Sequence, residues 1–134
     1  MVVPDVEVAA KGYVELLGIE MPAIRDGVKR TRHYLGKPLP EGVGLKVARF
    51  WLDNIEIELV EPVGGPSSWH DMLMESGPGV HHIAFEVQDS GQVIADLKAR
   101  GYSAIHTSLR ANGTPLAYVD ARSELGALME ILGT

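Results

Sequence analysis

The two halves of this chain carry the same succession of secondary-structure patterns, and each half closes on a strand with a glutamate at its middle. Ile57-Glu58-Leu59, near the end of the first half, corresponds to Met129-Glu130-Ile131 at the end of the second. Met1–Asp5, before the first helix, corresponds in the same way to Phe85–Asp89 before the second. Self-similarity of this kind indicates a duplicated supersecondary unit, in which each copy places its glutamate on the sheet face away from its helix.

Hydrophobic periodicity predicts the elements of each copy. Apolar residues at helical spacing predict a helix over residues 5–17, for which Asp5 is a suitable N-cap and Gly18 a suitable stop. The second long helix begins at Asp89 or Ser90 and ends at Gly101. The other predicted elements are a short strand at residues 19–21, a long loop or irregular hairpin over 24–44, a strand pair at 46–52 and 55–60, a short helix at 69–75, a strand after the Gly77-Pro78-Gly79 turn, and strands at 102–107, 116–120 and 127–132.

Composition excludes several classes of protein. With 134 residues, the chain can build one sizeable core but is too short for two ordinary domains. No apolar run approaches the roughly 20 residues of a membrane-spanning helix, and the residues from Met1 to Asp5 do not begin a signal peptide. The absence of cysteine excludes disulfides and cysteine-ligated zinc, and a net charge of −6 disfavours nucleic-acid binding. We therefore expect a cytoplasmic protein with neither a nucleic-acid nor a membrane partner.

Two adjacent histidines stand at the head of the strand that follows the Gly-Pro-Gly turn. Alternation along a strand predicts a core face for one set of side chains, His81, Ile83, Phe85 and Val87. His82, with Ala84 and Glu86, is then left on the opposite face. The function of the chain depends on which other groups converge on His82.

The predicted hairpin at residues 46–60 and the last strand supply candidates for that convergence. The faces away from the core carry Arg49 and Trp51 on one strand and Glu58 on the next, and Glu130 occupies the matching place in the second half. Carboxylate and imidazole ligands suit a borderline divalent ion such as Mn, Fe, Co, Ni or Zn. The alternative is structural: a strand histidine is commonly hydrogen-bonded in a core, and a strand glutamate is commonly solvated.

Three segments together resemble the vicinal oxygen chelate superfamily, and within it most closely the glyoxalase I and methylmalonyl-CoA epimerase branch. They are Gly79–Val87, Ile57–Pro62 and Leu128–Leu132, and the helix from Asp5 to Gly18 is similar to that family's opening helix. The resemblance implies an α+β fold (the glyoxalase/bleomycin resistance-type fold) of paired βαβββ modules that form a curved, cleft-lining mixed sheet. Here the first strand is cut short at Met1. We expect a single domain over residues 1–134, with modules at about 1–62 and 78–134 joined by a short helical linker at 63–77.

The resemblance also implies a site and a reaction. Glu58, His82 and Glu130 match three metal ligands of the family, and the ion would be Co, Ni, Mn, Fe or Zn. Such an enzyme is a metal-dependent isomerase, epimerase or lyase that acts through an enolate or enediolate on a small carbonyl or acyl-CoA substrate. Glu130 and Glu58 are then the catalytic candidates, and Arg49 and Trp51 would bind an anionic or carbonyl group beside an apolar body. Related proteins commonly dimerise, so we expect a homodimer.

Two departures from the family's pattern leave alternatives open. The family's first ligand is a histidine at the head of the first strand, and that position would precede Met1. The chain would then start downstream of the full strand, hold its ion with three protein ligands, or bind no metal. The epimerase's acidic base would be expected among residues 46–49, where Val47 and Arg49 face away from the core and Glu41 is the nearby carboxylate.

These departures leave two other functions as alternatives. One is a non-catalytic protein of the same fold that binds an antibiotic or polycyclic ligand, with Arg49 paired to Glu56 or Glu58 and Trp51 packed into a core. An extradiol dioxygenase fits less well, because its iron prefers two histidines and one carboxylate, and Glu58 stands where a histidine would be needed.

Overall fold

The computed structural model describes all residues, 1–134, and the chain divides into two compact units. Unit 1 comprises Met1–Lys29 and Pro40–Gly79, and unit 2 comprises Arg30–Leu39 and Val80–Thr134. The backbone therefore passes from one unit to the other three times, because the short segment 30–39 belongs with the second half of the chain. No helix in the chain is long and apolar enough to cross a membrane.

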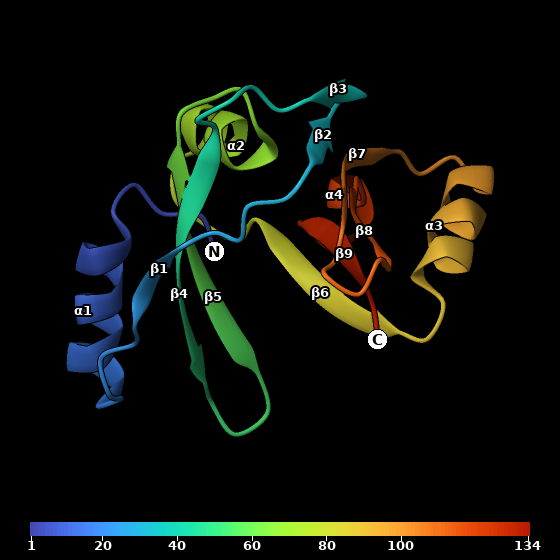
Figure 1. The fold of residues 1–134 in the computed structure, drawn as a ribbon. Helices are drawn as coiled ribbons and strands as arrows, with labels where there is room; N and C mark the ends of the chain where they lie inside the picture. Colours follow the sequence, from blue (N-terminus) through green and yellow to red (C-terminus); the bar gives the residue numbers. More distant parts are fainter. The chain divides into compact units, whose positions relative to one another are not determined.

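Unit 1 is a small sheet with helix α1 against it (Figure 1). Its elements are α1 (Val6–Leu17), β1 (Ile24–Asp26), β4 (Gly44–Trp51), β5 (Glu56–Val63) and α2 (Ser68–Ser76). The strands lie antiparallel in the order β1-β4-β5. On the outer side of β5, Val2 forms a parallel bridge with Val60. The backbone hydrogen bonds from Val60 N to Met1 O (2.8 Å) and from Val3 N to Val60 O (2.9 Å) make this first segment a short parallel strand partner.

Helix α1 begins and ends where the sequence predicts. The Asp5 side chain accepts a hydrogen bond from Val8 N, and Glu61 of β5 accepts one from Val6 N at 2.9 Å, so two carboxylates serve the first turn. Both negative charges also lie at the positive end of the helix dipole. Gly18 ends the helix at φ 67°, a left-handed conformation that a side chain with a Cβ disfavours.

The core of unit 1 lies between α1 and the β4–β5 hairpin. Ala48, Phe50 and Leu59 are buried on the helix-facing side, as predicted, and they pack with Val6 and Ala10 of the helix. The opposite side of the hairpin is not uniformly polar, because Val47 and Val60 are also buried. Strand alternation would place Ile55 on the same face as Leu59, but Ile55 lies next to the turn and is half exposed.

Unit 2 repeats the arrangement of unit 1 and extends it. Its elements are β2 (Arg32–Tyr34), β3 (Lys37–Pro38), β6 (His82–Val87), α3 (Ser90–Ala99), β7 (Ala104–Leu109), β8 (Pro115–Val119), α4 (Arg122–Leu125) and β9 (Leu128–Gly133). The sheet order is β3-β2-β7-β8-β9-β6, and β6 runs parallel to β9 while the other neighbours are antiparallel. In both units the first segment therefore lies parallel to the last strand. The predicted α+β fold of paired βαβββ modules is confirmed.

The segment from β2 to β3 is the extension. Residues 30–39 leave unit 1, and β2 adds to the free edge of β7, with Tyr34 opposite His106. Of the two alternatives for residues 24–44, the long loop was wrong for β1, β2 and β3, since β2 and β3 pair antiparallel as a short hairpin and β1 pairs with β4. The strand predicted at 19–21 does not form. Two- and three-residue strands carry too few side chains to show alternation, so their pairing depends on β4 and β7 rather than on local pattern.

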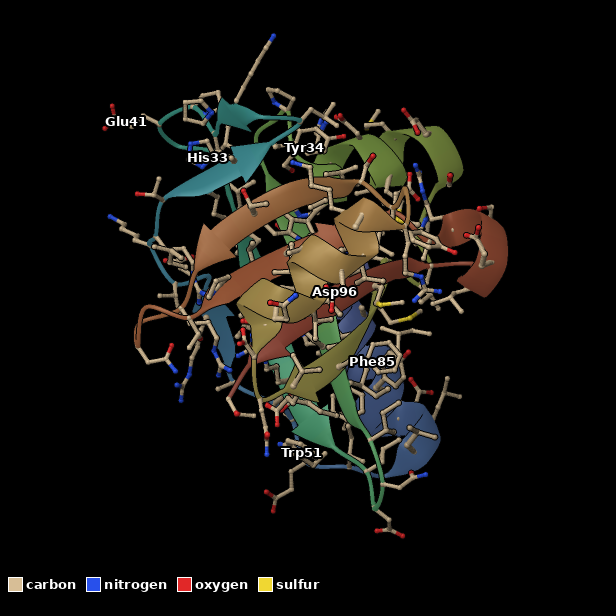
Figure 2. All side chains as sticks on the ribbon, turned by 90° about the vertical axis from the view of Figure 1, so that its right-hand side faces the viewer. His33, Tyr34, Glu41, Trp51, Phe85 and Asp96 are labelled. Atoms are coloured by element: carbon tan, nitrogen blue, oxygen red, sulfur yellow. The ribbon has the colours of Figure 1, made fainter.

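Helix α3 covers one face of the unit 2 sheet and leaves part of β6 uncovered. Ala117, Val119 and Ile131 form the buried cluster beneath the helix. Ile83 and Phe85, predicted on the core face, are 45% and 44% exposed. Figure 2, which looks onto α3, shows Phe85 beyond the outline of the helix. The prediction of a buried core face was wrong for these two residues, because β6 is the edge strand of the sheet and both side chains are nearly half exposed there.

Two segments that connect the longer elements contain short helices. The short helix predicted at 69–75 is confirmed as α2, with Ser67 as its N-cap, and Trp69 is 2% exposed. Trp69 is buried and α2 packs on β5, so the segment lies within unit 1. The turn predicted between the last two strands contains the single-turn helix α4, which ends at Gly126 with φ 73°.

Candidate functional site

His82 and Glu130 meet on the face of the unit 2 sheet opposite α3. Strands β6 and β9 run side by side, with His82 beside Leu128 and Ala84 beside Glu130. His82 Nε2 lies 3.3 Å from Glu130 Oε2, and the two side chains are only 7% and 11% exposed. The structure thus brings together two of the three predicted metal ligands.

His81 contacts His82 directly, which the alternation pattern did not predict. It lies one residue before β6 and is fully buried. Its Nδ1 is 2.9 Å from His82 Nδ1, and the two rings meet edge to face at 5.2 Å. Strict alternation does not extend to a residue outside the strand, so the prediction that His81 lies with Ile83 on the core face was wrong.

Tyr118 and His106, for which the sequence predicts no role, complete a row of side chains that crosses the sheet. Tyr118 pairs with Glu130 across β8 and β9, and His106 pairs with Tyr118 across β7 and β8. The Tyr118 ring stacks on His82 at 5.0 Å with an interplanar angle of 22°, and it lies 5.0 Å from the His106 ring. The available signal for Tyr118 was the period of two, because it lies between Ala117 and Val119 of the helix-facing cluster. A register irregularity between Ala104 and His106 breaks that period in β7.

The environment of His106 is strongly desolvating. Its side chain is 1% exposed, and burial, followed by the positive charge of Arg32 and by His33, lowers its pKa from 6.5 to about 3. Burial also lowers the pKa of Arg32, with Arg30 adding to the effect. His106 is therefore a neutral imidazole over the whole physiological pH range.

Glu58 is held by an ion pair within unit 1. It lies opposite Arg49 in the β4–β5 hairpin, and Arg49 Nε donates to Glu58 Oε2 at 2.5 Å, with Nη2 contacting the same oxygen. Glu56 lies on the other side of the guanidinium, with Oε1 3.8 Å from Arg49 Nε. This pairing is the alternative that the sequence left open for Arg49. The proposed roles of Glu58 and Arg49 toward metal and substrate remain predictions.

Trp51 does not pack into a core. It is the last residue of β4, lies opposite Glu56 near the hairpin turn, and is 73% exposed (Figure 2). Glu41, the carboxylate nearest in sequence to the strand where a base was expected, is exposed in the turn before β4. Exposure leaves both side chains available to a ligand and gives neither a fixed position.

His82 and Glu130 fit a divalent ion. Two ligands that are each about 2.1 Å from one metal lie about 3 Å from one another, which matches the spacing of His82 Nε2 and Glu130 Oε2. An imidazole with a carboxylate suits Mn, Fe, Co, Ni or Zn. No three His, Asp or Glu side chains gather into one metal-ligating group, and Glu58 belongs to unit 1 while the pair belongs to unit 2.

Comparison with known proteins identifies relatives across almost the whole chain. The chain is 31% identical over 134 residues to the ethylmalonyl-CoA/methylmalonyl-CoA epimerase of Cereibacter sphaeroides, covering 96% of this chain and 90% of that protein. It is 30% identical over 132 residues to the mitochondrial methylmalonyl-CoA epimerase of Homo sapiens, covering 96% of this chain and 68% of that protein.

Solved structures support the same fold. The crystal structure of methylmalonyl-CoA epimerase from Mycobacterium tuberculosis matches with a TM-score of 0.69 at 18% identity, over 98% of this chain and 82% of that one. A methylmalonyl-CoA epimerase in complex with methylmalonyl-CoA and NH4+ matches with a TM-score of 0.68 at 20% identity, over 99% of this chain and 89% of that one. A family model described as the Glyoxalase/Bleomycin resistance protein/Dioxygenase superfamily matches residues 1–118. The chain therefore belongs to this superfamily, the vicinal oxygen chelate proteins to which its sequence motifs are similar.

Proposed function

We propose that this protein is a metal-dependent epimerase of an acyl-CoA, with a 2-alkylmalonyl thioester such as methylmalonyl-CoA as its substrate. One observation carries the proposal: the buried His82–Glu130 pair, with a spacing that fits one ion, occurs in a chain similar over 96% of its length to two epimerases. The paired modules and the polar sheet face opposite α3 are consistent with it.

The reaction exchanges one hydrogen. The carbon between the thioester carbonyl and the free carboxylate loses its proton on one side and regains a proton on the other, so charge develops on the thioester oxygen. A divalent ion held by His82 and Glu130 would supply Lewis-acid stabilisation of that charge. We keep Glu58 as the third proposed ligand because Ile57–Pro62 matches the family's motif.

The protein's own groups must bind the substrate and move the proton. We assign the proton transfer to carboxylates, for which Glu58 and Glu130 are the candidates, since a carboxylate within reach of a carbon acid is an effective general base. Arg49 is proposed to bind the substrate's carboxylate or a phosphate, because a guanidinium binds such groups in a two-point geometry. Trp51 is proposed to pack on the apolar part of the ligand.

Solvent exchange tests the activity without a coupled assay. Purified protein, loaded with Co²⁺ or Zn²⁺, is incubated with methylmalonyl-CoA in deuterium oxide, and deuterium at the substrate's second carbon is measured by mass spectrometry. We expect incorporation that His82→Ala and Glu130→Ala abolish and that the surface variant Glu15→Ala preserves. Folded, metal-loaded wild type that leaves the substrate unlabelled would show that the proposed reaction is wrong.

A second candidate function rests on the Arg49–Glu58 ion pair. Because Arg49 occupies Glu58, the chain could bind an apolar ligand without a metal, as a non-catalytic antibiotic- or polycycle-binding protein. Metal content discriminates between the two functions. Less than one tightly bound ion per chain after metal titration, together with ligand-induced quenching of tryptophan fluorescence that is lost in Trp51→Phe, would favour the binding protein.

We also propose a homodimer, on the resemblance alone, and a cytoplasmic location. Sedimentation equilibrium of the purified chain tests the first, with a mass near twice the monomer's 14.5 kDa expected. Fractionation of the source cells tests the second. A monomer at high micromolar concentration would contradict the dimer and would leave the proposed chemistry unaffected.

A further inference from the structure

We propose that His81 and Tyr118 are positioning residues that hold His82 with its proton on Nδ1, so that the Nε2 lone pair is free for a divalent ion. This inference rests on the proposed function, because it assigns a purpose to a metal ligand. It concerns side chains that the sequence motif alone did not connect. All of them lie in unit 2.

A hydrogen bond joins the imidazoles of His81 and His82. His81 Nδ1 and His82 Nδ1 are 2.9 Å apart, which is hydrogen-bond distance. A hydrogen bond requires one donor and one acceptor, so only one of these two nitrogens carries the shared proton. The contact therefore couples the tautomer of His82 to that of His81.

The other ring nitrogen of His82, Nε2, faces Glu130. Nε2 lies 3.3 Å from Glu130 Oε2, so Nε2 is the nitrogen that faces the carboxylate and would share an ion with it. A metal-bound nitrogen must offer its lone pair, which moves the ring proton to Nδ1. His82 Nδ1–H then donates, and His81 Nδ1 is the acceptor. Metal-ligating histidines generally have such a partner on their second nitrogen.

The partner of His82, His81, is held rigidly. His81 is fully buried, and its carbonyl accepts a hydrogen bond from Leu128 N at 3.1 Å, which ties it to the strand that carries Glu130. Its ring also meets Tyr118 edge to face at 5.1 Å and 81°. His81 is thus fixed both by its backbone and by its ring.

The ring of Tyr118 fixes the plane of His82. Tyr118 is 5% exposed and stacks on the His82 imidazole at 5.0 Å and 22°. The direction of the Nε2 lone pair depends on that plane, because the lone pair lies within it. A stacked ring on one face and a hydrogen bond at Nδ1 leave His82 little freedom to rotate.

The experiment has one readout that needs no metal and one that does. In metal-free protein labelled with ¹⁵N-histidine, a scalar coupling through the hydrogen bond between the two Nδ1 nuclei should be detectable by NMR. On addition of Zn²⁺, a diamagnetic probe, the ¹⁵N shifts should report His82 with its proton on Nδ1. Folded protein that lacks the coupling, or zinc-loaded His82 with its proton on Nε2, would overturn the inference.

Zinc affinity of matched variants supplies the second readout. His81→Leu removes the acceptor and should weaken zinc binding about 10- to 100-fold. His81→Asn retains an acceptor oxygen close to the place of Nδ1 and should recover most of that loss. Tyr118→Leu should weaken binding, and Tyr118→Phe, which retains the ring, should rescue it. Because His81→Leu could fail to fold, the Asn variant and the wild-type NMR measurement keep the test decisive.

The outcomes separate this inference from the proposed function. If the wild type binds no zinc, the proposed metal-dependent reaction fails. If the wild type binds zinc and His81→Leu binds it equally well, the reaction stands and the positioning role alone is wrong.

Discussion

At the scale of single residues, His106 is the side chain whose chemistry the fold changes most. Burial and the neighbouring Arg32 lower its pKa to about 3, so it stays neutral where a free histidine becomes charged. In the unfolded chain the same imidazole binds a proton near pH 6.5. Between these two pH values the unfolded state binds more protons than the folded state, so stability falls as the pH falls.

The predicted consequence is an acid-dependent loss of stability that His106→Gln reduces. The contribution of the neutral, buried His106 to the free energy of unfolding is fully present above about pH 6.5. It is lost progressively as the pH falls toward 3. At pH 5 the loss from this one group should be about 2 kcal/mol relative to pH 7, on the basis of about 1.4 kcal/mol per pK unit. Urea unfolding of wild type and His106→Gln at both pH values measures it. If the free energy of unfolding changed equally between pH 7 and pH 5 in wild type and in His106→Gln, the acid-dependent loss would not come from His106.

The ion pair of Arg49 with Glu58 gives a second prediction at this scale. Arg49 is 56% exposed, so the pair contributes little to stability, on the order of 0–1 kcal/mol. Arg49→Met should therefore leave the melting temperature almost unchanged. If Arg49 binds the substrate's carboxylate as proposed, the same change should raise KM about tenfold or more, with a smaller effect on kcat. An unchanged KM would remove Arg49 from the proposed site.

At the scale of elements, the N-terminus of α1 shows how a local signal and a distant one combine. Asp5 is a local cap that the sequence predicts. Glu61 reaches the same turn from β5, fifty-five residues away, where it also pairs with Lys46 at 3.1 Å. A helix start that is held from both sides also fixes the position of α1 on its own sheet.

Removal of the local cap should cost a measurable amount. Asp5→Ala loses the hydrogen bond to Val8 N and should lower the free energy of unfolding by about 1 kcal/mol. Asp5→Asn keeps an acceptor at the same place and should retain most of the stability. Chemical denaturation of the three proteins measures this, and a loss in the Asn variant equal to that in the Ala variant would show that charge, rather than the cap, is what matters.

At the scale of the whole molecule, the chain builds two cores. Leu59 is fully buried in the core of unit 1 and Ile131 is 2% exposed in the core of unit 2. The duplicated module explains this division, since each helix packs on the sheet of its own unit. Loss of packing in one core should therefore destabilise mainly the helix and strands of its own unit.

Truncation of either residue tests that division. Leu59→Ala and Ile131→Ala should each cost about 2–5 kcal/mol, because each leaves a cavity in a packed core. Native-state hydrogen exchange should show faster exchange in α1, β4 and β5 for the first variant and in α3, β8 and β9 for the second. Equal acceleration across both units in each variant would contradict separate stabilisation and would mean that the chain opens as one cooperative body.

The sequence by itself determined the repeated module, the long helices and the β4–β5 hairpin, and it identified His82 and Glu130 as candidates for one site. Local periodicity, helix caps such as Asp5 and Asp89, and motifs that recur in both halves indicate these features. Periodicity predicts such elements because a helix or a strand of six or more residues places several side chains on its buried face, so the pattern repeats often enough to be recognised.

Only the tertiary structure decided the rest. Strands β1 to β3 exist because β4 and β7 offer them an edge, and Ile83 and Phe85 are exposed because β6 has a neighbour on one side only. The contacts of Tyr118 with His81 and His82 depend on the register of β6, β8 and β9, which brings Tyr118 beside residues 36 and 37 positions earlier in the sequence. Register is set by non-local pairing across the sheet, so no local pattern could place these rings around His82.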